Sequence, residues 1–298
     1  MSAATSTPTK PSNVSAVSTA VARRALPTVR AVTPTLHVHR AGSGQPLVLL
    51  HGLGESHIGW RPVIDALSQG YDVIAIDLPG FGRSPALPGS VSPTAVNLAT
   101  AVERTLDELG VGAFHVAGYS LGARVAVQLA GSDRVRSVIA IAPDGLGTPV
   151  ERMQGFVAMV AGRGVAMALA PFDGWFPAGR ALFFAGTRSL PWQIAPADAK
   201  QMLSDFAGAP AYDATNWASL FDMPTHLHTI TRPALFLQGT ADPLMVPQIS
   251  RYVGLIPGAN LIYLPGLNHV PISDDPKAVA HHMIRFLDHV AAHSITAD

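Results

Sequence analysis

The 298-residue sequence contains no cysteine, which excludes disulfides, thiolate metal centres and a cysteine nucleophile. Its 20 basic and 20 acidic side chains balance without a long run of either sign, which argues against nucleic acid and anionic membrane surfaces as partners. No continuously apolar run reaches the roughly 18 residues that a bilayer requires, so we expect no membrane span. Hydrophobic residues make up 48% of the chain, enough for one sizeable core, and we expect a cytoplasmic globular protein.

The N-terminal segment differs in composition from the rest of the chain. Serine, threonine, alanine and proline predominate in it, and the first acidic residue is Glu55. Such a segment buries too little apolar surface to offset the entropy cost of ordering it. We therefore expect a disordered tail over residues 1–34 and a single domain over residues 35–298. An acid-poor leader for an organelle is the alternative interpretation of the tail.

Short apolar runs alternate with segments of helical periodicity from Thr35 onward. Near-continuous apolar strands separated by helices are typical of a mostly parallel sheet covered on both faces. The sequence therefore predicts an α/β fold with a mostly parallel central sheet and helices on both faces. The expected strands are 36–40, 46–50, 71–76, 114–117, 137–143, 234–239 and 260–264. The expected helices are 60–67, one that begins at Ser92-Pro93 and ends at Gly110, one between Ser120 and Ala130, and a closing helix from Asp275.

One segment, at about 145–231, interrupts this alternation. It shows no clear strand and is rich in methionine, phenylalanine and tryptophan. We interpret it as a mainly helical insertion that forms a lid, although most of its apolar side chains are expected simply to pack the insertion onto the domain. Trp175 and Phe176 are the side chains that we expect near the mouth of a substrate pocket.

Ser120 stands between two glycines in the run Gly118-Tyr119-Ser120-Leu121-Gly122. The run follows an expected strand directly and precedes an expected helix directly, which is typical of a nucleophile elbow. In such an elbow the flanking glycines allow a close approach of the backbone, and the serine itself is strained. The strand–turn–helix context makes Ser120 a specific candidate for a nucleophile.

A serine hydroxyl is a weak nucleophile that needs a general base and a group to orient that base. Asp242 and His269 each follow a later strand, at the edge where an open parallel sheet places its chemistry. The order Ser, Asp, His is the one expected for this elbow. Asp144 also follows a strand and fits the same order, so it is the alternative orienting acid.

The motifs HGLGES, DLPGFGRS, GYSLGA, GTADP and NHVPISDDP occur in this order along the chain. With them, the chain from Leu36 to Val290 resembles the α/β-hydrolase-fold serine hydrolases, in particular carboxylesterases with a helical cap. As a set, these motifs specify the fold far better than they specify a substrate.

The resemblance implies a role for each matching residue. Ser120 would attack a carbonyl carbon, His269 would accept its proton, and Asp242 would orient His269. The backbone N–H groups of Leu53 and Leu121 would form an oxyanion hole. No cofactor is implied.

A serine at the elbow indicates acyl chemistry, since relatives that cleave carbon–halogen bonds or epoxides carry aspartate there. We expect a small-molecule acyl substrate, most simply a small apolar carboxylic ester with a medium acyl chain, and poor use of charged acids such as succinate monoesters. Carbon–carbon hydrolysis, perhydrolysis or a lyase reaction on the same fold stays open, as does a small-molecule receptor with slow turnover. The sequence leaves the oligomeric state open.

The remaining histidines do not indicate a metal site, because no carboxylate or thiolate joins them at ligand spacing. We expect His51 to brace the oxyanion loop, and Asp274 and Asp275 to cap the closing helix. No metal is predicted. The histidines considered are His37, His39, His226, His228, His281, His282, His289 and His293.

Overall fold

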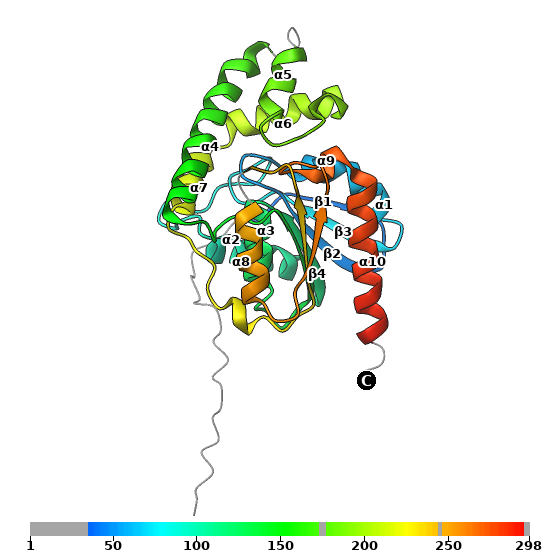
Figure 1. Cartoon of the computed structure of the whole chain (residues 1–298). Helices are drawn as coiled ribbons and strands as arrows, with labels where there is room; N and C mark the ends of the chain where they lie inside the picture. Colours follow the sequence, from blue (N-terminus) through cyan, green and yellow to red (C-terminus); the bar gives the residue numbers. More distant parts are fainter. Residues whose placement is uncertain (1–34, 173–176, 244–245, 295–298) are drawn as a thin grey trace, which may run out of the picture. The chain divides into compact units, whose positions relative to one another are not determined.

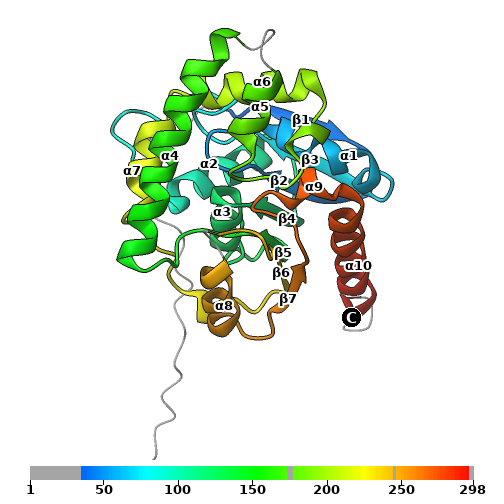
Figure 2. The ribbon, with the colours of Figure 1, turned by 45° about the horizontal axis from the view of Figure 1, so that its top comes forward.

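The structure, a computed structural model, describes residues 35–172, 177–243 and 246–294. Seven strands form one sheet (Figure 1) in the order β1-β3-β2-β4-β5-β6-β7, which can be followed along the strand labels of Figure 2. β1 pairs antiparallel with β3, and the other neighbouring strands pair in parallel. The predicted mostly parallel sheet is therefore confirmed. The strands are β1 (Val38–Ala41), β2 (Gln45–Leu50), β3 (Tyr71–Ile76), β4 (Phe114–Tyr119), β5 (Val135–Ile141), β6 (Ala234–Gly239) and β7 (Asn260–Leu264).

Helices cover both faces of the sheet (Figure 2). Helices α2 (Ala95–Glu108), α3 (Leu121–Leu129) and α8 (Val246–Leu255) bury apolar side chains in the core of one face. Helices α1 (Arg61–Leu67) and α10 (Pro276–Ser294) do the same on the opposite face. All six residues of β3 and of β4 are buried, as expected for strands sandwiched between two helical layers. The short elements η1 (His57–Trp60) and α9 (Pro271–Asp274) complete this part of the chain.

Between β5 and β6 the described residues form helices and no strand. Figure 1 shows α4–α7 gathered at one end of the sheet. Hydrogen bonds join this segment to the turn after β2, for example from Ser56 Oγ to Asp205 Oδ2 at 2.6 Å. Trp175 and Phe176, the predicted pocket residues, lie outside the described residues. The elements are α4 (Pro149–Leu169), η2 (Ala170–Phe172), α5 (Pro177–Phe184), η3 (Pro191–Gln193), α6 (Pro196–Gly208), α7 (Tyr212–Ser219) and η4 (Leu227–Thr229).

The stretch Pro149–Phe172, which contains α4, meets the length and composition criteria for a membrane-crossing helix, with a mean hydropathy of 1.5. Only 6% of its apolar window is buried. Our sequence argument missed it because that argument counted only uninterrupted apolar runs. Helices of soluble proteins also meet these two criteria, so length and composition by themselves do not place α4 in a bilayer.

Two capping predictions were wrong. The N-cap of α2 is Thr94, whose Oγ1 accepts the Asn97 N–H, and not Ser92. The backbone carbonyl of Ser92 instead accepts the Thr94 N–H at 2.8 Å, so residues 92–94 form a turn before the helix. Asp275 caps α10 as predicted, through the Ala278 N–H at 3.0 Å, but Asp274 does not.

Asp274 binds neighbouring loops instead of a helix end. Its carboxylate accepts the N–H groups of Ser189, Leu190 and Asn268 at 2.9, 3.0 and 3.1 Å. It therefore joins the loop that carries His269 to the segment between β5 and β6.

Candidate active site

Ser120 lies in a strained turn between β4 and α3. Its φ of 54° is in the left-handed region that non-glycine residues rarely adopt, as the elbow interpretation predicts. A Cβ on Gly118 would lie 2.1 Å from the Gly122 carbonyl oxygen, and one on Gly122 would lie 2.2 Å from that of Leu50. Both glycines are therefore required by the close contact of α3 with the ends of two strands.

His269 and Asp242 form a buried hydrogen-bonded pair. The Nδ1–H of His269 donates to Asp242 Oδ2 over 2.8 Å, and the two residues are 7% and 2% exposed. Gln238 Nε2 donates to the same Asp242 oxygen at 3.0 Å and fixes the carboxylate. Asp242 follows β6 and His269 follows β7, so the carboxyl ends of parallel strands bring together residues 27 positions apart.

Asp144, the alternative acid, lies in a different pair. Its Oδ1 is 3.4 Å from Nε of Arg124, which is 1% exposed. Arg124 also donates to the carbonyl of Asp222 and to Ser219 Oγ, at 2.9 and 2.7 Å. The geometry therefore favours Asp242 over Asp144 as the partner of His269.

The pKa of His269 is set by two opposing effects. Burial lowers it, but the charge and the hydrogen bond of Asp242 outweigh burial, and Asp144 and Glu55 add to them. The net effect raises the pKa of His269 above the ordinary value of an imidazole. This arrangement stabilises the imidazolium form that a general base acquires when it accepts a proton.

Ser120 and His269 line one cavity with a volume of about 70 Å³. Its wall includes the apolar side chains of Phe156, Met159 and Leu220, which come from α4 and from the end of α7. Among the described residues of the 145–231 segment, these three supply apolar side chains to the cavity wall. The remaining lining residues are Leu53, Asp144, Gly145, Glu151, Arg152, Gly155, Asn216, Ser219 and Gln248.

The two predicted oxyanion residues lie beside the nucleophile. Leu53 lines the cavity, and Leu121 follows Ser120 as the first residue of α3. Within the described residues, neither N–H donates to a backbone carbonyl, so both donors are free of backbone partners.

His51 braces the loop that contains Leu53, as predicted. Its Nδ1 lies 2.8 Å from the Gly52 carbonyl, and its Nε2 accepts the Leu78 N–H at 2.8 Å. Burial lowers the pKa of His51, which keeps the ring neutral. Both ring nitrogens are therefore engaged in holding the loop.

The sequence analysis missed a buried network directly behind the elbow. Tyr119 donates its hydroxyl to Glu55 Oε2 at 2.6 Å, and Arg188 Nη2 donates to Glu55 Oε1 at 2.8 Å. Burial raises the pKa of Glu55, but the charge of Arg188 and both hydrogen bonds outweigh it and lower the pKa overall. The only sequence signal was an acidic residue in a motif surrounded by apolar strands.

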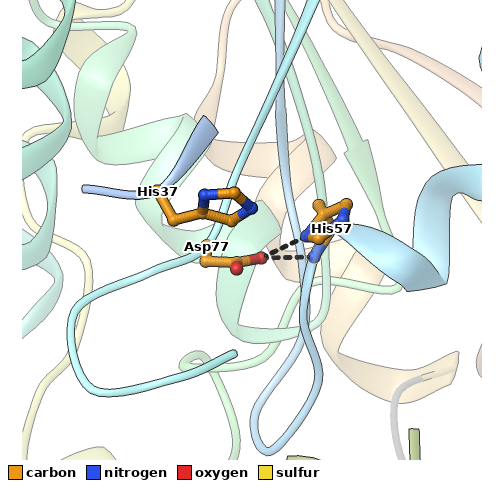
Figure 3. A group of neighbouring side chains, drawn as sticks. All are labelled: His37, His57 and Asp77. Carbon is orange, nitrogen blue, oxygen red and sulfur yellow. Dashed lines mark hydrogen bonds and ion pairs between the residues drawn. The ribbon is translucent and has the colours of Figure 1, made fainter. Parts of the chain in front are cut away.

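His37, His57 and Asp77 form a cluster with the composition of a metal site (Figure 3). Their candidate ligand atoms all lie within 4.8 Å of one another. The fold thus places the carboxylate of Asp77 close to two histidines, a proximity that the spacing of these residues along the sequence did not indicate.

Hydrogen bonding already explains the position of Asp77. The carboxylate accepts the His57 N–H at 2.7 Å, His57 Nδ1–H at 2.8 Å and the Arg83 N–H at 3.0 Å. Burial raises the pKa of Asp77, yet these hydrogen bonds, that of the His57 side chain most of all, lower it to about 2. Asp77 therefore holds two loops together without needing a metal ion.

Comparison with known proteins identifies the family. A model of the alpha/beta hydrolase family matches residues 47–282, and the chain belongs to this family. A pimeloyl-(acyl-carrier protein) methyl ester esterase of Aeromonas hydrophila is 43% identical over 110 residues, which are 36% of this chain and 41% of that protein. A 2-hydroxy-6-oxo-6-phenylhexa-2,4-dienoate hydrolase of Burkholderia cepacia is 36% identical over 118 residues, 38% of this chain and 41% of that protein. The chain thus spans about two fifths of the length of these relatives.

Solved structures share the fold over most of the chain. An esterase from Thermogutta terrifontis superposes with a TM-score of 0.68 at 22% identity, covering 86% of this chain and 93% of that one. An enol-lactonase from Burkholderia xenovorans gives 0.67 at 22% identity, covering 85% and 96%. At this identity the likeness concerns the fold.

Proposed function

We propose that this protein is a serine hydrolase that cleaves carboxylic esters of small molecules through Ser120, His269 and Asp242. The observation that carries the proposal is the shared cavity: His269, already hydrogen-bonded to a buried carboxylate, lines it together with a serine held at a φ of 54°. An activated nucleophile needs a hydroxyl, a base and a group that orients the base, and Ser120, His269 and Asp242 are the residues proposed for these three parts.

In the proposed reaction, Ser120 Oγ attacks the ester carbonyl while His269 accepts the serine proton. The Leu53 and Leu121 N–H groups stabilise the resulting oxyanion. His269 then protonates the departing alcohol, which leaves an acyl group on Ser120. Water, deprotonated by His269, attacks this acyl-enzyme and releases the acid and the free serine.

Carbon–carbon bond hydrolysis is the second candidate. The relative from Burkholderia cepacia is named for the hydrolysis of a 2-hydroxy-6-oxodienoate, and ester hydrolysis is named for the relative from Aeromonas. A panel that contains simple esters and 2-hydroxy-6-oxo-6-phenylhexa-2,4-dienoate separates the two by the ratio of kcat/KM.

Replacing the nucleophile tests the proposal. Ser120→Ala should lower kcat/KM for p-nitrophenyl butyrate by about 10⁴- to 10⁶-fold, because no other group can form the acyl-enzyme. Labelling of the wild type by a fluorophosphonate should be lost in the same variant. Ser219→Ala, which removes another hydroxyl lining the cavity, is the control and should cost less than about tenfold. A well-folded Ser120→Ala protein that retains a tenth of the wild-type activity would contradict the mechanism.

A further inference from the structure

The charged side chains of the cavity wall differ in whether they have an ion-pair partner. Asp144 and Glu151 carry the acidic charges, and both have an arginine partner outside the cavity lining. Asp144 faces Arg124 at 3.4 Å. Glu151 receives two hydrogen bonds from Arg251, at 2.6 and 3.1 Å, which contribute to lowering its pKa to about 2. Each of these two carboxylates therefore already has an arginine partner, and Nη1 of Arg124 also lies 3.6 Å from Oδ2 of Asp222.

Arg152 is the cation without a matching partner in this wall. It lines the cavity with Ser120 and His269, and its Nε is buried without a hydrogen-bond acceptor in the described part of the chain. Among the described residues no ion pair involving its guanidinium is found either. Burying a polar donor without an acceptor costs free energy, and the cost is greater for a charged group. The cavity that Ser120 lines therefore has in its wall an arginine with no described counter-ion.

The aliphatic stem of Arg152 packs closely against Gly147. Arg152 lies in the first turn of α4, next to the capping box of Thr148 and Glu151. A Cβ on Gly147 would lie 3.1 Å from Arg152 Cγ, so the glycine allows the aliphatic stem to pack against the backbone. Arg152 is thus held in the cavity wall by its stem, and among the described residues no acceptor occupies its Nε–H.

We propose that Arg152 binds a carboxylate of the substrate, so that the preferred esters are monoesters of short dicarboxylic acids. This inference rests on the proposed function, because the ester must reach Ser120 while the second carboxylate reaches Arg152. Arginine suits this task, since its planar guanidinium can donate two parallel hydrogen bonds to one carboxylate. The apolar wall formed by Phe156, Met159 and Leu220 then accommodates the methylenes between the two groups. The proposal replaces the sequence-based expectation that charged acids are poorly used, which considered the apolar residues of the segment and not Arg152.

The test compares a carboxylate with its neutral isostere. Monomethyl succinate, glutarate and adipate are each assayed against the corresponding methyl ester amide, in which a carboxamide replaces the free carboxylate. We expect the wild type to prefer the best carboxylate over its amide by about 10- to 100-fold in kcat/KM, the range of one charge-assisted hydrogen bond. A preference below about threefold for all three acids overturns the proposal without requiring any variant.

Variants then assign the preference to one side chain. Arg152→Gln should lose the preference by lowering kcat/KM for the carboxylate while that for the amide changes less than about threefold. Arg152→Lys should retain part of it, because the charge remains but the bidentate geometry is lost. Arg163→Gln is the matched control: it removes the same charge from α4, but Arg163 lies over the Tyr212 ring and does not line the cavity. If Arg163→Gln removes the preference as strongly as Arg152→Gln does, the effect is one of net charge and the proposal fails.

Ser120→Ala separates this proposal from the one on which it rests. If Ser120→Ala abolishes hydrolysis of both the ester acid and the ester amide, and Arg152→Gln leaves their ratio unchanged, only the carboxylate site is wrong. If Ser120→Ala hydrolyses both substrates at the wild-type rate, the proposed function fails as well.

Discussion

At the scale of single residues, the site is defined by how each carboxylate is paired. Asp242 accepts hydrogen bonds from His269 and Gln238, whereas Asp144 faces the buried guanidinium of Arg124. Both aspartates are close enough to raise the pKa of His269, but only Asp242 also does so by a direct hydrogen bond. A group that must fix the tautomer of the imidazole needs that bond, and long-range charge cannot replace it.

Substitution of the two aspartates by asparagine should therefore have unequal effects. Asp242→Asn should lower kcat by roughly 10⁴-fold, because an amide favours the wrong tautomer of His269. Asp144→Asn should cost less than about tenfold. Steady-state kcat for an activated ester, with circular dichroism to verify folding, measures both.

The dependence of kcat/KM on pH offers a second way to compare Asp242→Asn with Asp144→Asn. The acidic limb of kcat/KM reports the pKa at which free His269 becomes neutral. Since the Asp242 charge raises that pKa, the limb should move to lower pH in Asp242→Asn and only slightly in Asp144→Asn. If Asp144→Asn gave the larger loss of kcat and the larger shift, Asp144 would be the orienting acid.

At the scale of elements, one buried ion pair joins the segment between β5 and β6 to the nucleophile elbow. Arg188, between α5 and η3, contacts Glu55, and Glu55 accepts the hydroxyl of Tyr119 beside Ser120. Arg188 is 2% exposed, and its guanidinium also lies 4.7 Å from the centre of the Phe184 ring. A surface pair, Arg61 with Asp198, joins the same segment to α1, and the arginine side chain in it is 52% exposed.

Removing the two arginines should have very different effects on stability. Arg188→Met leaves the Glu55 charge buried and uncompensated, which should reduce the free energy of unfolding by about 3–5 kcal/mol at pH 8. Arg61→Met should cost less than about 1 kcal/mol, as is usual for exposed pairs. Urea unfolding of both variants measures the difference.

The pH dependence distinguishes a buried charge from lost packing. In the wild type the pKa of Glu55 is lowered, so its contribution to stability is present above the unfolded-state pKa and is lost as the pH falls through the folded-state pKa. Without Arg188, burial alone raises that pKa, so protonation relieves the strain and the loss in Arg188→Met should shrink as the pH decreases toward 5. The double variant Glu55→Gln/Arg188→Met should recover much of the stability at pH 8. A loss that is the same at both pH values would indicate packing instead.

Local patterns predicted the elements well, because near-continuous apolar runs and glycines act over a few residues. The strands at 71–76, 234–239 and 260–264 match β3, β6 and β7 to the residue. The contacts that the sequence did not reveal are those that depend on the fold. The Glu55–Arg188 pair spans 133 positions, and the bonds from Ser189 and Leu190 to Asp274 span 85 and 84. Nothing in the spacing of such residues along the chain indicates that they meet.

At the scale of the whole molecule, the position of the candidate site follows from the way the helices cover the sheet. Helices occupy both faces of the sheet and build two separate apolar cores, so the candidate site lies beyond the sheet faces, at the carboxyl ends of the strands. The segment between β5 and β6 lies over this edge and contributes one wall of the cavity from α4. Under the proposed function we therefore expect substrate choice to depend on α4, whereas the groups proposed for the reaction come from the strand ends.

The division between α4 and the strand ends predicts how neutral esters of increasing chain length behave. The cavity, at about 70 Å³, is small compared with the several hundred cubic ångströms of typical ligand pockets. Each methylene buried against Phe156 and Met159 should contribute up to about 0.8 kcal/mol, or about threefold in kcat/KM. For p-nitrophenyl acetate, butyrate, hexanoate and octanoate, kcat/KM should therefore rise from acetate to butyrate and level off once the cavity is full.

Met159→Ala should move the optimum to a longer chain by enlarging the cavity. Met153→Ala, a side chain on the same helix that is 51% exposed and lies outside the cavity lining, should leave the series unchanged. A series that is flat or falls from acetate onward would mean that the acyl chain does not lie against α4.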